Sequence, residues 1–405
     1  MRPTPTPVSS RGRACTGPAG ETPSFVNRKR LVLGAAVLVV LGAAGWLTAR
    51  ALPAPVERAA IPARPILGNG VDTPKDMAWV PGGAFLMGSD SKLSNPNERP
   101  AHEVRVHGFW MDVTDVTNDQ FADFVRQTGY VTTAQRKPDW DTVRVQLPPG
   151  TPKPPDSVLV PGAMVFTGTT APVRLDQYWR WWRFVPGADW RHPQGPGSGI
   201  EGKGDHPVVQ VSYEDAQAYA RWAGKRLPTE AEWEFAARGG LEQADYAWGN
   251  ELAPEGRKRA NYWDANQGAF PVARADAKVG APGTQPVKTY PDNAYGLYDM
   301  TGNAWQWVAD WYRTDYFARQ AGQAARGMAI VDPAGPADSY DPSDPGVPVD
   351  APRRVIRGGS FLCNEDFCTS YRPSARRGAD PYSPMSHLGF RLVKDVPPPR
   401  AGAEG

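Results

Sequence analysis

Cysteine is nearly absent from this sequence, with three residues in a chain of 405. Three cysteines cannot form a disulfide scaffold, so that class of secreted domain is excluded. Charge of one sign is lacking as well, since 45 basic and 43 acidic residues give a formal charge of +2 without a long run of either sign. A protein that binds nucleic acid through its charge needs a basic patch or stripe, and we therefore expect no nucleic-acid partner.

Glycine, proline and tryptophan are what the sequence has in abundance. The chain contains 42 Gly, 43 Pro and 15 Trp, and its hydrophobic fraction of 40% is enough for a sizeable core. Glycine and proline favour turns, whereas each buried tryptophan removes a large apolar area from water. The composition predicts a compact domain of loops and turns held by aromatic anchors, and the length allows one large domain or two ordinary ones.

The residues before Met77 differ from the rest of the chain. Residues 1–30 are polar and rich in Pro, Ser and Arg, which predicts a disordered cytoplasmic leader. Residues 31–49 carry no charge, and about 19 residues of helix just span a bilayer core, so they predict a transmembrane anchor. The basic run Arg28–Arg30 keeps the N-terminus in the cytoplasm. The alternative is a cleaved secretory signal ending near Arg50; both place the domain in the periplasmic or extracellular space.

The remaining sequence divides into a linker, one domain and a tail. Residues 50–76 are a Pro-rich linker, 77–393 form a single domain, and 394–405 are predicted to be a disordered tail. A Gly-Gly turn within residues 77–89 predicts a β-hairpin, and residues 102–112 alternate as a strand does.

Three helices have recognisable first residues. A hydroxyl side chain followed three residues later by Gln, Asp or Glu is typical of a capping box. The pairs are Thr117 with Gln120, Ser212 with Asp215, and Thr229 with Glu232, and the expected C-terminal stops are Gly129, Gly224 and Gly239. Two stretches rich in Pro and Asp, 137–175 and 317–353, are predicted to be irregular functional surface or mobile insertions.

The two cysteines of the domain, Cys363 and Cys368, are five positions apart. In a straight strand their Cα atoms would be about 16 Å apart. If the chain bends through residues 364–366, the two sulfurs converge, and three outcomes are open: a structural disulfide, a thiolate metal site or a redox couple. Two thiolates without a nearby His or third Cys suit Cu(I) and suit zinc poorly, because structural zinc takes four ligands.

Four motifs are specific enough to compare the sequence with a known family. They are GKRLPTEAEWEFAARGG (224–240), YGLYDMTGNAWQWVADWY (295–312), RVIRGGSFLC (354–363) and HLGFRLV (387–393). Together they resemble the formylglycine-generating enzyme (sulfatase-modifying factor) family over residues 77–393, and GADWRHPQGPGS (187–198) resembles its sulfatase-activating branch. The resemblance implies a single loop-rich α+β fold, distantly like that of C-type lectins, with little regular secondary structure.

The resemblance also implies a chemistry. The cysteines that match Cys363 and Cys368 bind Cu(I) in the family, with O2 as co-substrate, and the enzyme oxidises a cysteine in the C-x-P-x-R motif of an unfolded sulfatase to Cα-formylglycine. Ser360 matches a serine beside the copper, although it could equally close a Gly-Gly-Ser turn. Arg372 and Arg376 match arginines of the substrate cleft, with structural ion pairs as the alternative role.

Three positions depart from the family pattern near the cysteines. Asn364 replaces a histidine, Phe367 replaces a tyrosine, and His387 replaces an asparagine. We expect His387 among the substrate-binding residues. The departures affect the handling of substrate and oxygen and leave both predicted copper ligands in place.

Structural calcium is the second metal that the resemblance implies. Calcium prefers six to eight oxygen ligands, many of them loop carbonyls. The residues of the first site would be Asp299, Gly302, Ala304 and Gln306, and those of the second Asn261, Tyr262 and Asp276. The family has Glu at the position of Gln306, so one negative charge is missing here. The alternative is that all of these are ordinary turn residues.

Other functions remain open at this point. Because the superfamily also contains iron-dependent sulfoxide synthases and non-catalytic binding domains, the fold alone does not decide the activity. The sulfoxide synthases need a His-rich helical domain, and no such domain precedes this one. A membrane-anchored, lectin-like binding or accessory module is one alternative, and the same oxidation of another exported protein is a second. We expect a monomer.

Overall fold

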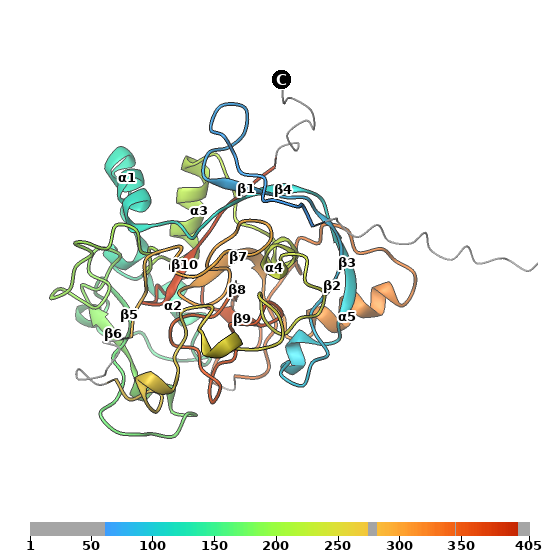
Figure 1. Cartoon of the computed structure of the whole chain (residues 1–405). Coiled ribbons are helices and arrows are strands. Elements are labelled where there is room, and N and C mark those ends of the chain that lie inside the picture. The colour runs from blue at the N-terminus through green and yellow to red at the C-terminus, as the bar shows by residue number, and fades with distance from the viewer. Residues whose placement is uncertain (1–60, 274–281, 345, 396–405) are drawn as a thin grey trace, which may run out of the picture. The chain divides into compact units, whose positions relative to one another are not determined.

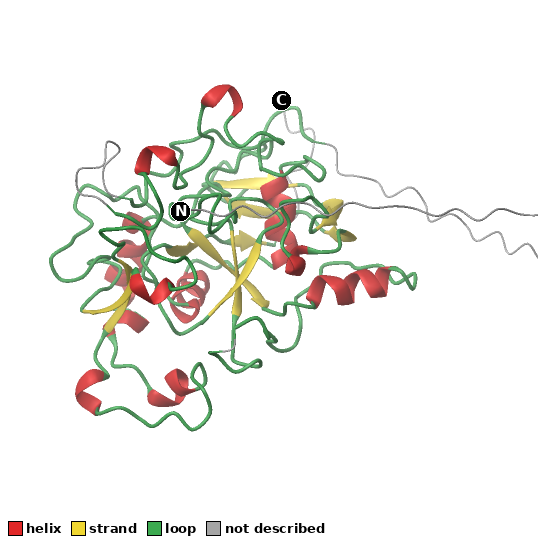
Figure 2. Ribbon diagram, turned by 90° about the horizontal axis from the view of Figure 1, so that it is seen from below, coloured by secondary structure: helices red, strands yellow, loops and turns green. Residues whose placement is uncertain are grey.

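The computed structural model describes residues 61–273, 282–344 and 346–395. Loops connect most of the helices and strands in that part of the chain, which confirms the expected loop-rich mixed fold (Figure 2). The predicted leader and the predicted transmembrane segment 31–49 lie outside the described residues. Among the helices that are described, none has the length and apolarity needed to cross a membrane.

Four strands form a bent antiparallel ribbon. β1 (Met77–Val80) pairs with β4 (Phe109–Asp112), and β2 (Gly83–Met87) pairs with β3 (His102–Val106). The predicted hairpin within 77–89 is therefore wrong, because the Gly-Gly pair bends one side of the ribbon and the chain reverses only after Met87. The predicted strand 102–112 bends opposite that point at Gly108, where a Cβ atom would lie 2.4 Å from the Trp79 ring.

A four-stranded sheet forms the centre of the domain (Figure 1). Its order is β10 (Leu388–Phe390), β7 (Trp305–Trp311), β8 (Arg354–Arg357) and β9 (Arg376–Ala379). The pairing of β10 with β7 is parallel and the other two pairings are antiparallel. The short strand β11 (Val393–Lys394) then pairs with the free edge of β4. The last strand of the described chain therefore lies beside the N-terminal ribbon.

The three predicted capped helices are present. They are α1 (Asn118–Thr128), α3 (Tyr213–Trp222) and α4 (Glu230–Arg238), and each has the predicted capping box at its start. Gly129 and Gly239 end α1 and α4 with φ values of 68° and 55°, in the left-handed region that glycine tolerates.

The two stretches predicted to be irregular contain regular elements. The first includes α2 (Trp140–Arg144) and β5 (Gly162–Phe166), which pairs with β6 (Trp182–Pro186), and the second includes α5 (Tyr316–Ala324). Short 3-10 turns are found at Pro96–Glu98, Thr133–Gln135, Asp156–Val158, Tyr178–Arg180, Pro254–Gly256 and Ala265–Gln267.

Packing extends a little beyond the predicted domain boundaries. The N–H of Trp79 donates to the carbonyl of Ile66 over 2.8 Å, so part of the predicted linker lies along β1. Inside the domain, the two cysteines belong to a buried cluster that also contains Trp190, Trp307 and Tyr371. Both cysteines are thus part of the core, whereas Glu365 and Asp366 between them are exposed.

Candidate active site

Cys363 and Cys368 lie between β8 and β9 and are joined by a disulfide, with their Cα atoms 4.6 Å apart. The predicted bend is confirmed, and Asn364 makes it. Its side-chain oxygen accepts the N–H groups of Asp366 and Phe367, each over 2.9 Å, and its carbonyl accepts the N–H of Cys368 over 3.1 Å. An asparagine that bonds its own backbone two and three residues on favours such a turn, so this departure from the family residue has a local structural role.

Ser360 fixes the start of the same loop. It is fully buried, its carbonyl accepts the N–H of Cys363 over 2.9 Å, and its hydroxyl accepts the N–H of Leu362 over 3.3 Å. Gly359 precedes it with a φ of 69°, and a Cβ atom there would lie 2.8 Å from the backbone of Tyr371. These bonds match the turn-closing alternative for Ser360, and they position Cys363.

Aromatic side chains enclose the cysteine loop. Phe367 stacks on Phe270, with ring centroids 5.3 Å apart, and meets Trp181 edge to face at 5.7 Å. The backbone N–H of Trp263 donates to the carbonyl of Cys363 over 2.9 Å. The exposed fractions are 1% for Cys363 and 6% for Cys368, so the sulfurs lie in an apolar, largely water-free setting.

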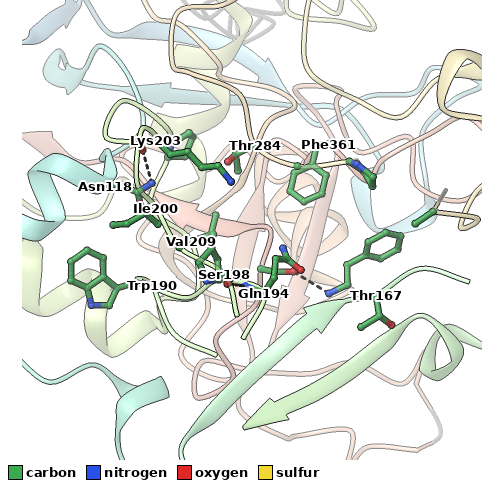
Figure 3. Close-up of a pocket in the computed structure, with 18 residues that line it drawn as sticks. Asn118, Thr167, Trp190, Gln194, Ser198, Ile200, Lys203, Val209, Thr284 and Phe361 are labelled. Carbon is green, nitrogen blue, oxygen red and sulfur yellow. Dashed lines mark hydrogen bonds between the residues drawn. The ribbon is translucent and has the colours of Figure 1, made fainter. Parts of the chain in front are cut away.

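A cavity of about 390 Å³ opens beside this loop (Figure 3). Its lining includes Phe361, two residues before Cys363, and Ser386, the residue before His387. Figure 3 shows Phe361 and Thr167 on one side of it and Trp190 on the other. The volume and the mixed apolar and polar lining are typical of a ligand site.

His387 is buried beside this cavity. It is 8% exposed, its ring lies 4.7 Å from that of Trp182, and its carbonyl accepts the N–H of Trp305 over 2.8 Å. Burial, with a smaller effect from the positive charge of Arg377, lowers the pKa of His387 to about 3. The imidazole is therefore neutral at physiological pH.

Arg372 and Arg376 are fully engaged in buried ion pairs. Arg372 bonds Glu98 through two N–H groups over 2.6 and 2.7 Å, and Arg376 bonds Glu230 over the same two distances. Burial opposes ionisation of Glu98, but the hydrogen bonds and charge of Arg372 outweigh it, so the pKa of Glu98 is lowered. Both arginines fit the structural alternative, and we place neither in the substrate site.

Sequence comparison identifies the family. The model of the sulfatase-modifying factor enzyme 1-like domain matches residues 65–396. The chain is 46% identical over 324 residues to a formylglycine-generating enzyme of Thermomonospora curvata, covering 79% of this chain and 94% of that one. The chain belongs to the sulfatase-modifying factor family.

Two further relatives show the range of this family. A formylglycine-generating enzyme of Mycobacterium tuberculosis is 44% identical over 326 residues, which cover 79% of this chain and 98% of the relative. An inactive Cα-formylglycine-generating enzyme 2 of Mus musculus is 37% identical over 327 residues, covering 80% and 87%. Because the family includes an inactive relative at this similarity, the site residues must carry the functional argument.

The cysteine pair fits the copper ion that the family implies. Both cysteines are buried and their sulfurs are adjacent. Cu(I) accepts a small number of soft thiolate ligands, whereas zinc requires more. The fit requires the reduced pair, since a disulfide offers no thiolate.

The first predicted calcium site does not fit calcium. The side-chain oxygen of Gln306 accepts from Trp233 Nε1 over 2.7 Å and from Arg391 Nε over 2.9 Å. Both partners can only donate, which fixes the orientation of the amide, and its amino group therefore faces the carbonyl of Asp299, 3.0 Å away. A donor and the buried guanidinium of Arg391 thus occupy the positions that oxygen ligands and a cation would need.

The second predicted calcium site also contains a side-chain cation. The ammonium of Lys258 donates to the carbonyl of Tyr262 and lies 3.3 Å from the carboxylate of Asp264. The side chain of Asn261 bonds the carbonyl of Gly283 over 3.0 Å. Asp276, the third residue of this predicted set, lies outside the described residues. A guanidinium and an ammonium group thus lie among the described residues of the two predicted sets, and these residues do not fit calcium in this structure.

Sequence reasoning missed the residues that enclose the cysteines. Trp181, Phe270 and Trp263 lie far from the cysteine motif in the sequence and reach it only through the fold. The one available indication was the abundance of tryptophan, which predicts aromatic packing without giving its location.

Proposed function

We propose that this chain is a formylglycine-generating enzyme, which oxidises a cysteine in the C-x-P-x-R motif of an unfolded sulfatase to Cα-formylglycine. The observation that carries the proposal is the juxtaposition of Cys363 and Cys368, buried beside an open cavity in a family with named enzymes of this activity. A lectin-like binding module could use this pair only as a structural disulfide, whereas the proposed enzyme needs the two thiols in the reduced form.

The electron balance of this reaction requires a co-reactant. Conversion of the substrate's thiol-bearing methylene group to an aldehyde removes two electrons, whereas reduction of O2 to water takes four. We propose an external thiol as the donor of the other two. One substrate thiol, one O2 and two external thiols then give one aldehyde, one hydrogen sulfide, one disulfide and one water. The same reductant would open the Cys363–Cys368 disulfide.

Copper is the cofactor that we propose for this site, with Cys363 and Cys368 as its ligands. Bound Cu(I) would supply the capacity to take up a substrate thiol and to pass electrons to oxygen. The chain supplies the arrangement: Asn364 bends the loop so that both sulfurs converge, and Phe367 with its aromatic neighbours excludes water from them.

Substrate recognition involves both the cavity and the loop. The cavity of about 390 Å³ accommodates residues beside the target cysteine. The arginine of the C-x-P-x-R motif requires an acidic partner, and the exposed carboxylates of Glu365 and Asp366 are the ones that the cysteine loop itself offers. Ser360 and His387 are buried, and His387 is neutral. Both residues then contribute to the site by packing behind the residues that line it.

The proposed location follows from residues 31–49. We propose that they anchor a monomer in the membrane with its N-terminus in the cytoplasm and its catalytic domain exported, with a cleaved secretory signal as the alternative. An exported sulfatase that is still unfolded would meet the enzyme there.

The direct test uses the full-length protein in detergent, loaded with Cu(I) and supplied with a thiol reductant and a C-x-P-x-R peptide. Mass spectrometry then follows loss of the cysteine sulfur and appearance of the aldehyde, in air and without oxygen. We expect Cys363→Ser and Cys368→Ser each to abolish the product. Cys15→Ser, which alters the third cysteine of the chain, is the matched control and should retain full activity.

Four outcomes separate the proposal from its alternatives. Aldehyde that depends on copper and oxygen establishes the activity. Copper binding without product would indicate the same chemistry on another exported protein. Product that survives in either single cysteine variant would remove the cysteines from the mechanism, and absence of both product and copper binding would favour a lectin-like module.

A further inference from the structure

A second cavity adjoins the one beside the cysteine loop. It measures about 420 Å³ and shares Thr167 and Ala273 with the first cavity. Its other lining residues are Gly168, Thr169, Thr170, Trp179, Arg180 and Arg183. Thr167 lies on the Phe361 side of the first cavity (Figure 3). The second cavity therefore borders the first on the side of the cysteine motif.

The surface around this second cavity is aromatic and basic. Tyr178 and Trp179 are 52% and 57% exposed, and their rings meet edge to face at 5.6 Å. Exposed aromatic residues next to arginine are typical of the residues that dominate binding energy at protein interfaces. We call Tyr178, Trp179, Arg180 and Arg183 the aromatic-basic platform.

Among the residues that the structure describes, no carboxylate forms an ion pair with either arginine of the platform. Arg183 donates to the carbonyl of Trp179 over 2.9 Å, and Arg180 reaches the amide oxygen of Gln177 at 3.5 Å. No described residue that lines either cavity is acidic, and Lys203 adds a further positive charge to the first cavity. By contrast, Arg174 in the same segment is neutralised by Asp176 at 2.6 Å.

The platform is connected firmly to the cysteine site. Trp181 follows Arg180 directly, is fully buried, and packs against Phe367, the residue before Cys368. The N–H of Thr167 donates to the carbonyl of Trp181 over 2.9 Å, and Phe166 pairs with Trp182 in the β5–β6 hairpin. The rings of Trp181 and Phe367 thus connect the platform to Cys368.

We propose that the aromatic-basic platform binds an acidic side chain of the substrate polypeptide, at a position outside the C-x-P-x-R motif. The carboxylate is held by Arg180 and Arg183 while the flanking chain packs on Trp179, because guanidinium groups bind carboxylates in paired, charge-assisted hydrogen bonds. The platform thereby selects among sulfatases that share the same motif. This inference rests on the proposed function for the identity of the occupant.

The test compares two peptides of identical C-x-P-x-R core, in which the residues on both flanks are Asp in one and Asn in the other. The target cysteine is replaced by serine, so that binding to the full-length protein is measured by fluorescence anisotropy without turnover. We expect the Asp peptide to bind about three- to tenfold more tightly at low salt, with a smaller difference at high salt.

Variants locate the effect on the platform. The double change Arg180→Gln, Arg183→Gln should abolish the preference for the Asp peptide, whereas Arg174→Gln, the matched control, should retain it. Equal binding of both peptides by the wild-type protein, or an unchanged preference in the double variant, overturns the inference. If the preference is present but the cysteine-containing peptides give no aldehyde, the proposed function is wrong. The inference that the platform binds an acidic side chain is then retained.

Discussion

Replacing Arg372 with methionine tests whether this arginine stabilises the fold or binds substrate. Its side chain and that of Glu98 are 1% and 0% exposed, and their two hydrogen bonds are joined by a third from Ser374 to Glu98 over 2.7 Å. Methionine retains most of the apolar volume but leaves the Glu98 carboxylate buried without its counter-charge. Breaking one side of a buried ion pair costs about 3–5 kcal/mol of unfolding free energy.

The unfolding free energy that Arg372→Met removes should depend on pH in a defined direction. In the wild-type protein the pKa of Glu98 is lowered, so the ion pair contributes its full stability above the pKa of an unfolded glutamate, about 4.3, and loses it as the pH falls through the folded pKa. Without Arg372, burial raises the pKa of Glu98. The cost of the substitution should therefore be largest near neutral pH and smaller in acid, where Glu98 is protonated.

The assay is urea unfolding followed by tryptophan fluorescence, with KM and kcat measured under conditions where each variant is folded. The double variant Arg372→Met, Glu98→Gln removes both charges and should recover at least half of the lost stability. Arg221→Met, on the exposed face of α3, is the control and should change stability little. A loss of unfolding free energy below about 1 kcal/mol for Arg372→Met, together with a raised KM, would refute this reasoning. It would indicate that Arg372 binds substrate.

Two further predictions follow from the site. Removal of calcium with a chelator should leave the Tm unchanged, because Arg391 and Lys258 occupy the cation positions; a fall of several degrees that added calcium reverses would contradict this. His387, with its pKa lowered to about 3, should show no imidazole titration by NMR between pH 5 and 8. Since the unfolded histidine takes up a proton below about pH 6.5, this site should cost about 1.4 kcal/mol of stability per pH unit toward pH 3, and His387→Asn should remove that dependence. An unchanged pH dependence in the variant would show that other groups cause it.

Local sequence rules predicted the capped helices correctly because each capping box lies within one helical turn. The pair Thr117 and Gln120 needs no information from elsewhere in the chain, and α1 begins where that pair indicates. The hairpin prediction failed for the opposite reason. A Gly-Gly pair marks a bend as readily as a reversal, and only the pairing of β1 with β4 shows which of the two occurs.

The features of the candidate site that depend on neighbouring residues were predictable from the sequence. Those that depend on residues far apart in the sequence were not. The convergence of Cys363 and Cys368 depends on a bend of a few residues, which the intervening Asn364 favours. The roles of the arginines depend on partners 274 and 146 residues away, Glu98 and Glu230, which no local pattern connects to them. The family motif 224–240 contains Glu230, but a motif does not show that this carboxylate neutralises Arg376.

The position of β11 has a consequence for how the protein is made. β4 remains without its second neighbour until Val393 and Lys394 have been synthesised, near the end of the described chain. The cysteine loop, in contrast, closes over five residues and needs little of the fold to do so. During vectorial synthesis, thiol pairing can therefore precede completion of the scaffold. A product that stops short of Val393 would keep both cysteines and lack the strand that pairs with the second edge of β4.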